Sequence, residues 1–238
     1  MSESARQPTA AGLILRGGPI SPFVRKVAMC IIEKGIESRV QCVRSVTAIA
    51  TPNIELQRFN PLSKIPTLIT AEGLALFDSD VICEYLDTEY PPATLYPARG
   101  PTRWLTLRWC ALGSGILDAL VLWRTERNRP PAQQMPTILG ALDVKVNAAL
   151  DLIEYELPAI QASGVDISHV AIACALGYLD FRFSDINWRS SRPRARAWLE
   201  EFSQRPAFRR TLPYEVSSPS EAEPHFWKQA VFPEAPSS

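Results

Sequence analysis

Short apolar runs and amphipathic stretches alternate along the first part of the chain. Residues 13–16 form an apolar run, residues 22–35 carry apolar side chains at helical spacing, and residues 38–43 alternate between apolar and polar positions. This pattern predicts a strand, a helix and a second strand. A β-α-β unit of this kind normally forms a right-handed crossover between two parallel strands.

A weak helix or turn follows, and then a second set of elements. Residues 67–70 and 74–77 are apolar runs separated by a short turn that contains glycine, which predicts a β-hairpin. The next predicted helix opens at Asp78-Ser79, with Ser79 as its cap. The order β-α-β, a linking segment and then β-β-α predicts an α/β thioredoxin-like domain over residues 12–92.

The second half of the chain has a helical pattern throughout. Residues 93–100 belong to a proline-rich connector and are expected to be a linker. Beyond it, apolar side chains recur at helical spacing and predict an all-α helical domain over residues 101–212, in which Asp166 caps a strongly apolar helix. Residues 1–11 are expected to form a flexible N-terminal tail, and residues 213–238 a C-terminal tail.

Composition narrows the classes of function. The 238 residues include 25 basic and 25 acidic side chains with no run of lysine or arginine, so nothing favours a nucleic-acid partner. The five cysteines are widely spaced and include no C-x-x-C pair, which predicts neither a disulfide framework nor a metal site. No apolar run approaches the ~20 residues that span a bilayer, and the start of the chain lacks a signal peptide. These features predict a cytoplasmic protein without a metal or a membrane partner.

Ser21 is the first candidate for chemistry. Pro22 suits the first position of a helix, which makes Ser21 the N-cap. A hydroxyl at this point lies beside unpaired N–H groups and the positive end of the helix dipole, a place that favours an anion such as a thiolate or carboxylate. The alternative is that Ser21 is only a cap, which is the commoner role of serine at a helix start.

Two further features suit a peptide ligand. Pro66 begins a strand and cannot donate to its ladder, which leaves the backbone groups of Ile65 open to an extended peptide. The helix that opens at Ser79 offers N–H groups to a carboxylate, while Asp78 can hold an ammonium group. Together they suit the amino-acid end of a peptide, although an ordinary helix cap would use the same two residues.

Five motifs in this order make the chain resemble the cytosolic glutathione S-transferases over residues 12–212. They are Ser21-Pro22-Phe23-Val24-Arg25-Lys26, similar to the Ser-Pro-Phe motif of the plant tau class and of a bacterial group; Asn60-Pro61-Leu62-Ser63-Lys64-Ile65-Pro66, similar to the family's Asn-Pro-x-Gly-x-Val-Pro loop; Asp78-Ser79; the capped helix from Asp166 to Ala175; and Arg205-Pro206-Ala207-Phe208. Each motif is short, so the resemblance is specific only because all five motifs occur in the order found in the family.

The resemblance implies a glutathione S-transferase with a detoxification role, usually a homodimer, with glutathione as co-substrate and a small hydrophobic electrophile. It implies that the Ser21 hydroxyl donates a hydrogen bond to the glutathione sulfur, and that the Ile65-Pro66 bond is cis. Contacts to glutathione are implied for Phe23, Lys64, Ile65, Pro66, Asp78 and Ser79. A neighbouring apolar pocket for the electrophile is expected to include Trp109, Ile116 and Trp123.

The sequence also departs from the family pattern. Ser63 replaces the loop glycine, so the backbone there must tolerate a glycine-like conformation. Arg44 and Lys64 are the candidates for the glycyl carboxylate of glutathione. Serine rather than cysteine at the active position favours conjugation, whereas glutathione-dependent disulfide reduction or peroxide reduction could still run through the bound thiolate. A non-catalytic member of the fold that binds a partner or carries a ligand is the alternative from a different class.

Overall fold

The computed structural model describes residues 12–92, 95–214 and 226–229. The predicted tail at residues 1–11 and most of the predicted tail at residues 213–238 lie outside the described residues. The chain divides into two compact units, one made of residues 1–92 with residues 210–238 and the other of residues 93–209. The predicted fold class is confirmed: a thioredoxin-like unit with a mixed sheet, and an all-helical unit.

The first unit is built on a four-stranded sheet in the order β2-β1-β3-β4. Its strands are β1 (Leu13–Gly17), β2 (Val40–Arg44), β3 (Thr67–Ile69) and β4 (Ala75–Phe77). β1 runs parallel to β2 and antiparallel to β3, and β3 is antiparallel to β4. The parallel pair is the predicted β-α-β unit, and the antiparallel pair is the predicted hairpin.

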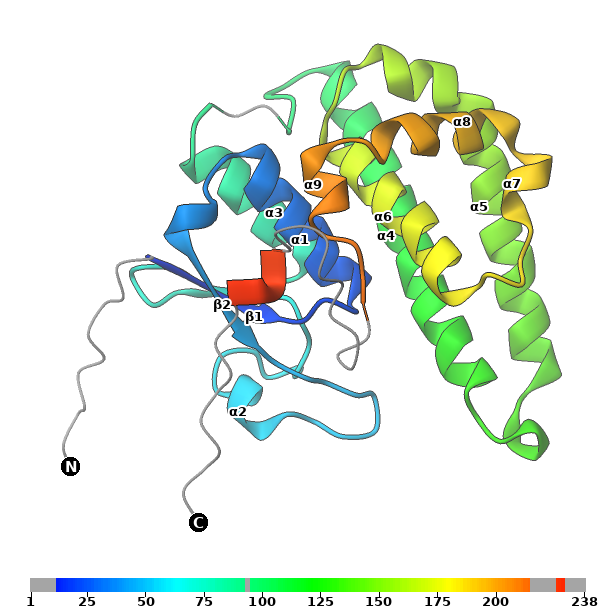
Figure 1. Ribbon diagram of the computed structural model, residues 1–238, viewed down its shortest axis with the longest axis horizontal. Helices are drawn as coiled ribbons and strands as arrows, with labels where there is room; N and C mark the ends of the chain where they lie inside the picture. Colours follow the sequence, from blue (N-terminus) through cyan, green and yellow to red (C-terminus); the bar gives the residue numbers. More distant parts are fainter. Residues whose placement is uncertain (1–11, 93–94, 215–225, 230–238) are drawn as a thin grey trace. The chain divides into compact units, whose positions relative to one another are not determined.

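The helices of this unit are α1 (Pro22–Glu33), α2 (Ile54–Gln57) and α3 (Ser79–Glu89), with a short 3₁₀ turn, η1 (Glu37–Arg39). α1 and α3 pack side by side (Figure 1). Two ion pairs join them: Lys26 Nζ lies 2.7 Å from Asp80 Oδ1, and Lys34 Nζ lies 2.9 Å from Asp87 Oδ1. Since Ser21 caps α1 and Asp78 precedes α3, these pairs set the relative position of two candidate site segments.

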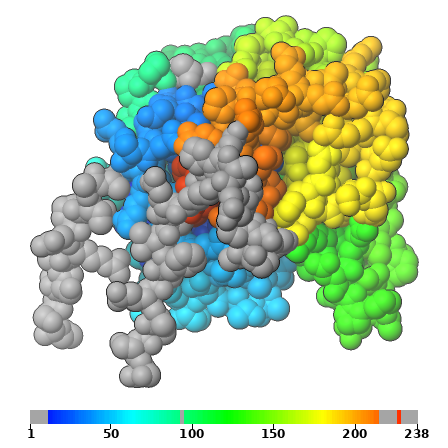
Figure 2. Space-filling view, viewed as in Figure 1, coloured from blue at the N-terminus to red at the C-terminus, as the bar shows by residue number. Residues whose placement is uncertain are grey.

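The chain beyond Arg209 returns to the first unit. Arg210 pairs with Glu37, and the backbone N–H of Phe226 donates to the carbonyl of Arg210 over 2.9 Å. Phe226 and Trp227 open a short turn, η3 (Phe226–Gln229), and both side chains are buried. The turn is red in Figures 1 and 2 and contacts β2. The Trp227 ring lies 3.2 Å from where a Cβ on Gly17 would stand, so the close contact depends on the missing side chain.

The second unit is all helical. Its elements are α4 (Pro101–Arg127), η2 (Pro131–Gln133), α5 (Pro136–Ala162), α6 (Ile167–Arg182), α7 (Trp188–Ser191), α8 (Pro193–Phe202) and α9 (Pro206–Arg209). α6 is buried over most of its length and packs against α4. A Cβ on Gly113 of α4 would lie 2.7 Å from the backbone carbon of Ala171, so glycine is what permits this close crossing.

Among the described helices, α4 alone is long and apolar enough to cross a membrane by length and composition. It packs against α5 and α6 inside the helical unit. The core helix of a water-soluble protein passes the same test, so the finding is weak evidence for a membrane span.

Asp166 caps α6, as the pattern predicts, within a network of polar side chains. Its Oδ1 accepts the backbone N–H of Ser168 over 2.9 Å, and its Oδ2 accepts the Thr106 hydroxyl over 2.8 Å. His169 completes a capping box, because its Nδ1 accepts the backbone N–H of Asp166. Burial raises the pKa of Asp166, but the hydrogen bonds that its carboxylate accepts, among them those from the Ser168 and Thr106 hydroxyls, outweigh burial and lower the pKa to about 2.

We expect the Asp166 carboxylate to stabilise the fold in a pH-dependent way. Its folded-state pKa lies below the ordinary value of 3.8, so its contribution is complete above about pH 4 and is lost as the pH falls towards 2. The difference corresponds to about 2 kcal/mol. Urea unfolding of wild type and Asp166→Asn should therefore differ by about this amount at pH 6 and progressively less between pH 4 and 3. A difference that does not change with pH would contradict the prediction.

Candidate functional site

The structure places Ser21 at the N-cap of α1, as predicted. Its backbone is extended, with φ −75° and ψ 123°, and its Oγ accepts the N–H of Val24 over 3.3 Å. The side chain is half-buried. Because the oxygen accepts from the helix, the hydroxyl proton remains available to donate to an anion at this helix start.

The loop before β3 is held by side-chain hydrogen bonds to its own backbone. The Asn60 amide donates to the carbonyl of Lys64 over 3.0 Å and accepts the N–H of Leu62 over 3.0 Å. Ser63 has φ 52°, the glycine-like conformation that its position in the motif requires, and its Oγ accepts the N–H of Asn53 over 2.6 Å. The Ile65-Pro66 bond is cis, as the resemblance implies.

α3 begins differently from the prediction. The N-cap is Asp78, whose carboxylate accepts the N–H of Asp80 over 2.8 Å, and the prediction of Ser79 as cap is wrong. Asp78 has φ 73°, which turns the chain sharply after β4 and leaves Ser79 as a buried residue of the first helical turn. The sequence could not separate the two residues, since aspartate and serine are equally good caps.

The strand register explains why these segments meet. On β3, Thr67 pairs with Arg16 of β1 on one side and with Phe77 of β4 on the other. On β1, Gly17 pairs with Arg44 of β2. The carboxyl ends of β1, β2 and β4 and the amino end of β3 therefore lie at the same end of the sheet.

Each candidate follows or precedes one of these strand ends. The loop to Ser21 leaves β1, Pro66 immediately precedes β3, and Asp78 and Ser79 follow β4. The guanidinium carbon of Arg44, at the end of β2, lies 3.8 Å from where a Cβ on Gly18 would stand. The fold thus brings four groups to one end of the sheet: Ser21 at the start of α1, Pro66 before β3, the Asp78 carboxylate and the Arg44 guanidinium.

The other candidates of the first unit differ in exposure. Phe23 and Ile65 are half-buried, and Lys64 is exposed.

Burial raises the pKa of the Cys42 thiol to about 12 and that of the Cys83 thiol well above its usual range, so neither is a thiolate near neutral pH. Among the described residues, no group of three or more His, Cys, Asp or Glu side chains could hold a metal ion.

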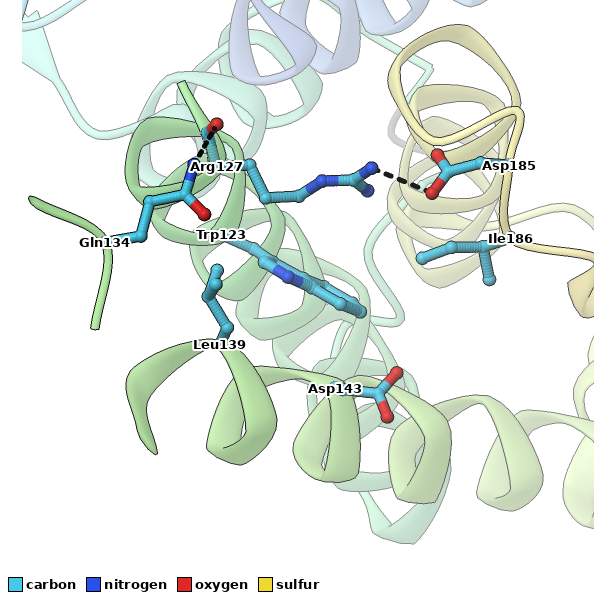
Figure 3. A pocket seen from close by; sticks show the side chains of 7 residues that line it. All are labelled: Trp123, Arg127, Gln134, Leu139, Asp143, Asp185 and Ile186. Atoms are coloured by element: carbon cyan, nitrogen blue, oxygen red, sulfur yellow. Dashed lines mark hydrogen bonds and ion pairs between the residues drawn. The ribbon is translucent and has the colours of Figure 1, made fainter. Parts of the chain in front are cut away.

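In the helical unit, the three residues expected around the electrophile have different surroundings. Trp109 is buried, and its indole N–H donates to Glu156 over 2.6 Å. Ile116 is buried in the core. Trp123 lines a cavity of about 320 Å³ together with Arg127 and Asp185 (Figure 3). Of the three residues, Trp123 lines this cavity, whereas Trp109 and Ile116 do not.

A second cavity of about 380 Å³ adjoins Arg127, and no pattern in the sequence predicts it. It is lined by Arg124, Arg127, Asn128, Phe181, Arg182 and Phe183. Helical spacing could have paired Arg124 with Arg127, but Arg182 lies on another helix. Only the packing of α4 against α6 assembles the cluster.

The chain is similar to known proteins over most of its length. The family profile "Glutathione S-transferase, N-terminal domain" matches residues 20–89, and "Glutathione S-transferase, C-terminal domain" matches residues 136–201. The uncharacterized GST-like protein YibF of Escherichia coli K12 is 36% identical over 202 residues, which are 84% of this chain and 98% of that protein.

Two solved structures are also similar. A glutathione transferase family member from Pseudomonas fluorescens Pf-5, with bound glutathione, has a TM-score of 0.83 and 41% identity, covering 85% of this chain and 100% of that one. A family member from the same organism with bound S-(propanoic acid)-glutathione has a TM-score of 0.79 and 40% identity over the same shares of the two chains.

Proposed function

Because the chain belongs to the glutathione S-transferase family, we propose that it is a transferase that binds glutathione and transfers its thiol to a small apolar electrophile. The observation that carries the proposal is the convergence of Ser21, Pro66, Asp78 and Ser79 at one end of the sheet. The homodimer, the cytoplasmic location and the role in detoxification belong to the same proposal.

In this proposal, glutathione lies along the segment before β3. The backbone of Ile65 pairs with the tripeptide, Phe23 and Pro66 contact it, and Lys64 or Arg44 holds its glycyl carboxylate. At the other end, the γ-glutamyl ammonium pairs with the exposed Asp78 carboxylate, and its carboxylate accepts from the first turn of α3 at Ser79. Each charged group of the ligand then has a counterpart of suitable charge or dipole.

The serine performs the chemical step by stabilising charge. The Ser21 hydroxyl donates to the glutathione sulfur and favours the thiolate, which attacks the electrophile. With an activated aryl chloride as the electrophile, the thiol proton passes to solvent, the S–C bond forms first, and the C–Cl bond then breaks as chloride leaves. The similar Pseudomonas fluorescens protein with S-(propanoic acid)-glutathione holds a glutathione thioether, the kind of compound that conjugation forms, and this supports transfer over disulfide exchange.

Binding is tested by retention on immobilised glutathione and by calorimetric titration of glutathione into wild type and Asp78→Asn. Asparagine caps a helix as well as aspartate and tolerates a positive φ, so the variant removes the charge and keeps the fold. We expect its affinity for glutathione to fall roughly 10- to 100-fold, since hydrogen bonds to charged groups contribute about 1.5–3 kcal/mol.

Three other results would change this conclusion. Failure of wild type to bind glutathione would overturn the proposal and favour a partner-binding protein. Binding without turnover of any electrophile would favour a ligand carrier. Equal affinity in wild type and Asp78→Asn would remove Asp78 from the site.

A further inference from the structure

Two aromatic residues from late in the chain are buried in the first unit, at the end of the sheet where the candidate site residues converge. Phe226 and Trp227 belong to η3, which contacts β2. η3 lies beyond residue 201, where the match to the family's C-terminal domain ends. The contacts proposed above for glutathione include neither residue, so their burial needs a reason of its own.

The segment that leads to η3 is attached to the first unit by side-chain and backbone hydrogen bonds. In α1, Arg25 Nε donates to Thr211 Oγ1 over 3.4 Å, and both side chains are buried. Arg210 pairs with Glu37 of η1, and its carbonyl accepts a backbone N–H of η3. Chain ends are well ordered only where contacts tie them down. These contacts therefore hold Trp227 at one place on the first unit.

Trp227 meets the end of β1 at a glycine. A Cβ on Gly17 would lie 2.8 Å from both methyl carbons of Val24 and 3.2 Å from Trp227 Cη2. Val24 and Trp227 therefore lie around the space that a side chain at position 17 would fill, and both are buried. Protein interiors are close-packed, so removal of the indole would leave a cavity beside Gly17 and Val24.

Gly17 and Val24 stand at the two ends of the segment that includes Ser21. Gly17 is the last residue of β1, and Val24 lies in the first turn of α1, where its N–H donates to Ser21 Oγ over 3.3 Å. Hydrogen bonds weaken steeply with misalignment, so a shift of either end would weaken a bond from the Ser21 hydroxyl. We propose that Trp227 is a positioning residue, which holds the start of α1 and thereby fixes the place of the Ser21 hydroxyl.

The first test needs no ligand. Amide hydrogen exchange is followed by NMR in the full chain at Val24, the donor to the cap, and at Ile31 near the other end of α1. In Trp227→Ala we expect exchange at Val24 to become at least tenfold faster relative to Ile31, because the helix start opens locally. Trp227→Phe, which keeps an aromatic ring, should lie closer to wild type. Trp104→Ala removes the same side chain from an exposed position on α4 and should change neither amide.

The second test rests on the proposed function and follows turnover of glutathione with 1-chloro-2,4-dinitrobenzene against pH. We expect Trp227→Ala to lower kcat roughly tenfold and to raise the apparent pKa of the bound thiol, with the KM for glutathione little changed. The physical reason is that a displaced hydroxyl stabilises the thiolate less well. In the Ser21→Ala background, Trp227→Ala should cause no further change, because its effect passes through Ser21.

The two tests separate positioning from packing. Equal acceleration of exchange at Val24 and Ile31 in Trp227→Ala would make Trp227 a core residue only and overturn the proposal. A further fall in turnover when Trp227→Ala is added to Ser21→Ala would overturn it as well, since Trp227 would then act on another group. If wild type neither binds nor turns over glutathione, the proposed function fails, and exchange at Val24 still decides the role of Trp227. Trp227→Leu, a smaller truncation, gives the same comparisons if Trp227→Ala does not fold.

Discussion

Ser21→Ala is expected to lower turnover of glutathione with 1-chloro-2,4-dinitrobenzene roughly 10- to 100-fold, with little change in glutathione affinity. A free thiol has a pKa of about 8.5, and lowering it by about two units requires about 2.7 kcal/mol. A hydrogen bond to a charged group contributes about 1.5–3 kcal/mol, and a helix N-terminus adds about 0.3–1 kcal/mol. The hydroxyl therefore supplies most of the effect and the helix supplies the rest.

The pH dependence of turnover distinguishes this role from capping. In Ser21→Ala the apparent pKa of the bound thiol should rise towards that of free glutathione, while Ser21→Thr, which keeps both the hydroxyl and the cap, should resemble wild type. Loss of the cap alone costs about 1 kcal/mol of stability and leaves the pH profile where it was. Equal turnover in wild type and Ser21→Ala would make Ser21 a cap and nothing more.

Asp87→Asn is expected to lower the free energy of unfolding by roughly 3 kcal/mol. The side chains of Lys34 and Asp87 are 2% and 1% exposed, and their charged atoms lie 2.9 Å apart. Removal of the Asp87 charge leaves the buried Lys34 ammonium, among the described residues, with only the neutral carbonyls of Asp87 and Pro92 as acceptors, which costs more than the pair itself contributes. Because the pair joins α1 to α3, the variant should also bind glutathione more weakly.

The matched control for this prediction removes both charges. The double variant Lys34→Met with Asp87→Leu should recover most of the lost stability, since apolar side chains of similar size can replace a buried pair. Urea unfolding followed by circular dichroism measures both changes. Asp87→Asn within 1 kcal/mol of wild type would show that the pair contributes little.

Local chemistry made several features predictable. Ser21-Pro22 combines the preferred cap with the preferred first helical residue, so the start of α1 follows from neighbouring residues alone. Asp166 before an apolar helix is a signal of the same kind. The start of α3 was harder to predict, because whether Asp78 or Ser79 is the N-cap depends on how the chain leaves β4.

The sequence by itself determined the order of the elements, the two classes of domain and the loop that carries Ser63, because periodicity, capping residues and prolines act over a few neighbouring positions. Only the tertiary structure decided which distant groups meet. The register of β3 with β1 and β4 brings Pro66 and Asp78 to the end where the loop to Ser21 begins. The packing of α4 against α6 likewise assembles Arg124 and Arg182 around one pocket. Contacts of this kind depend on which surfaces pack together, and no local pattern in the chain encodes them.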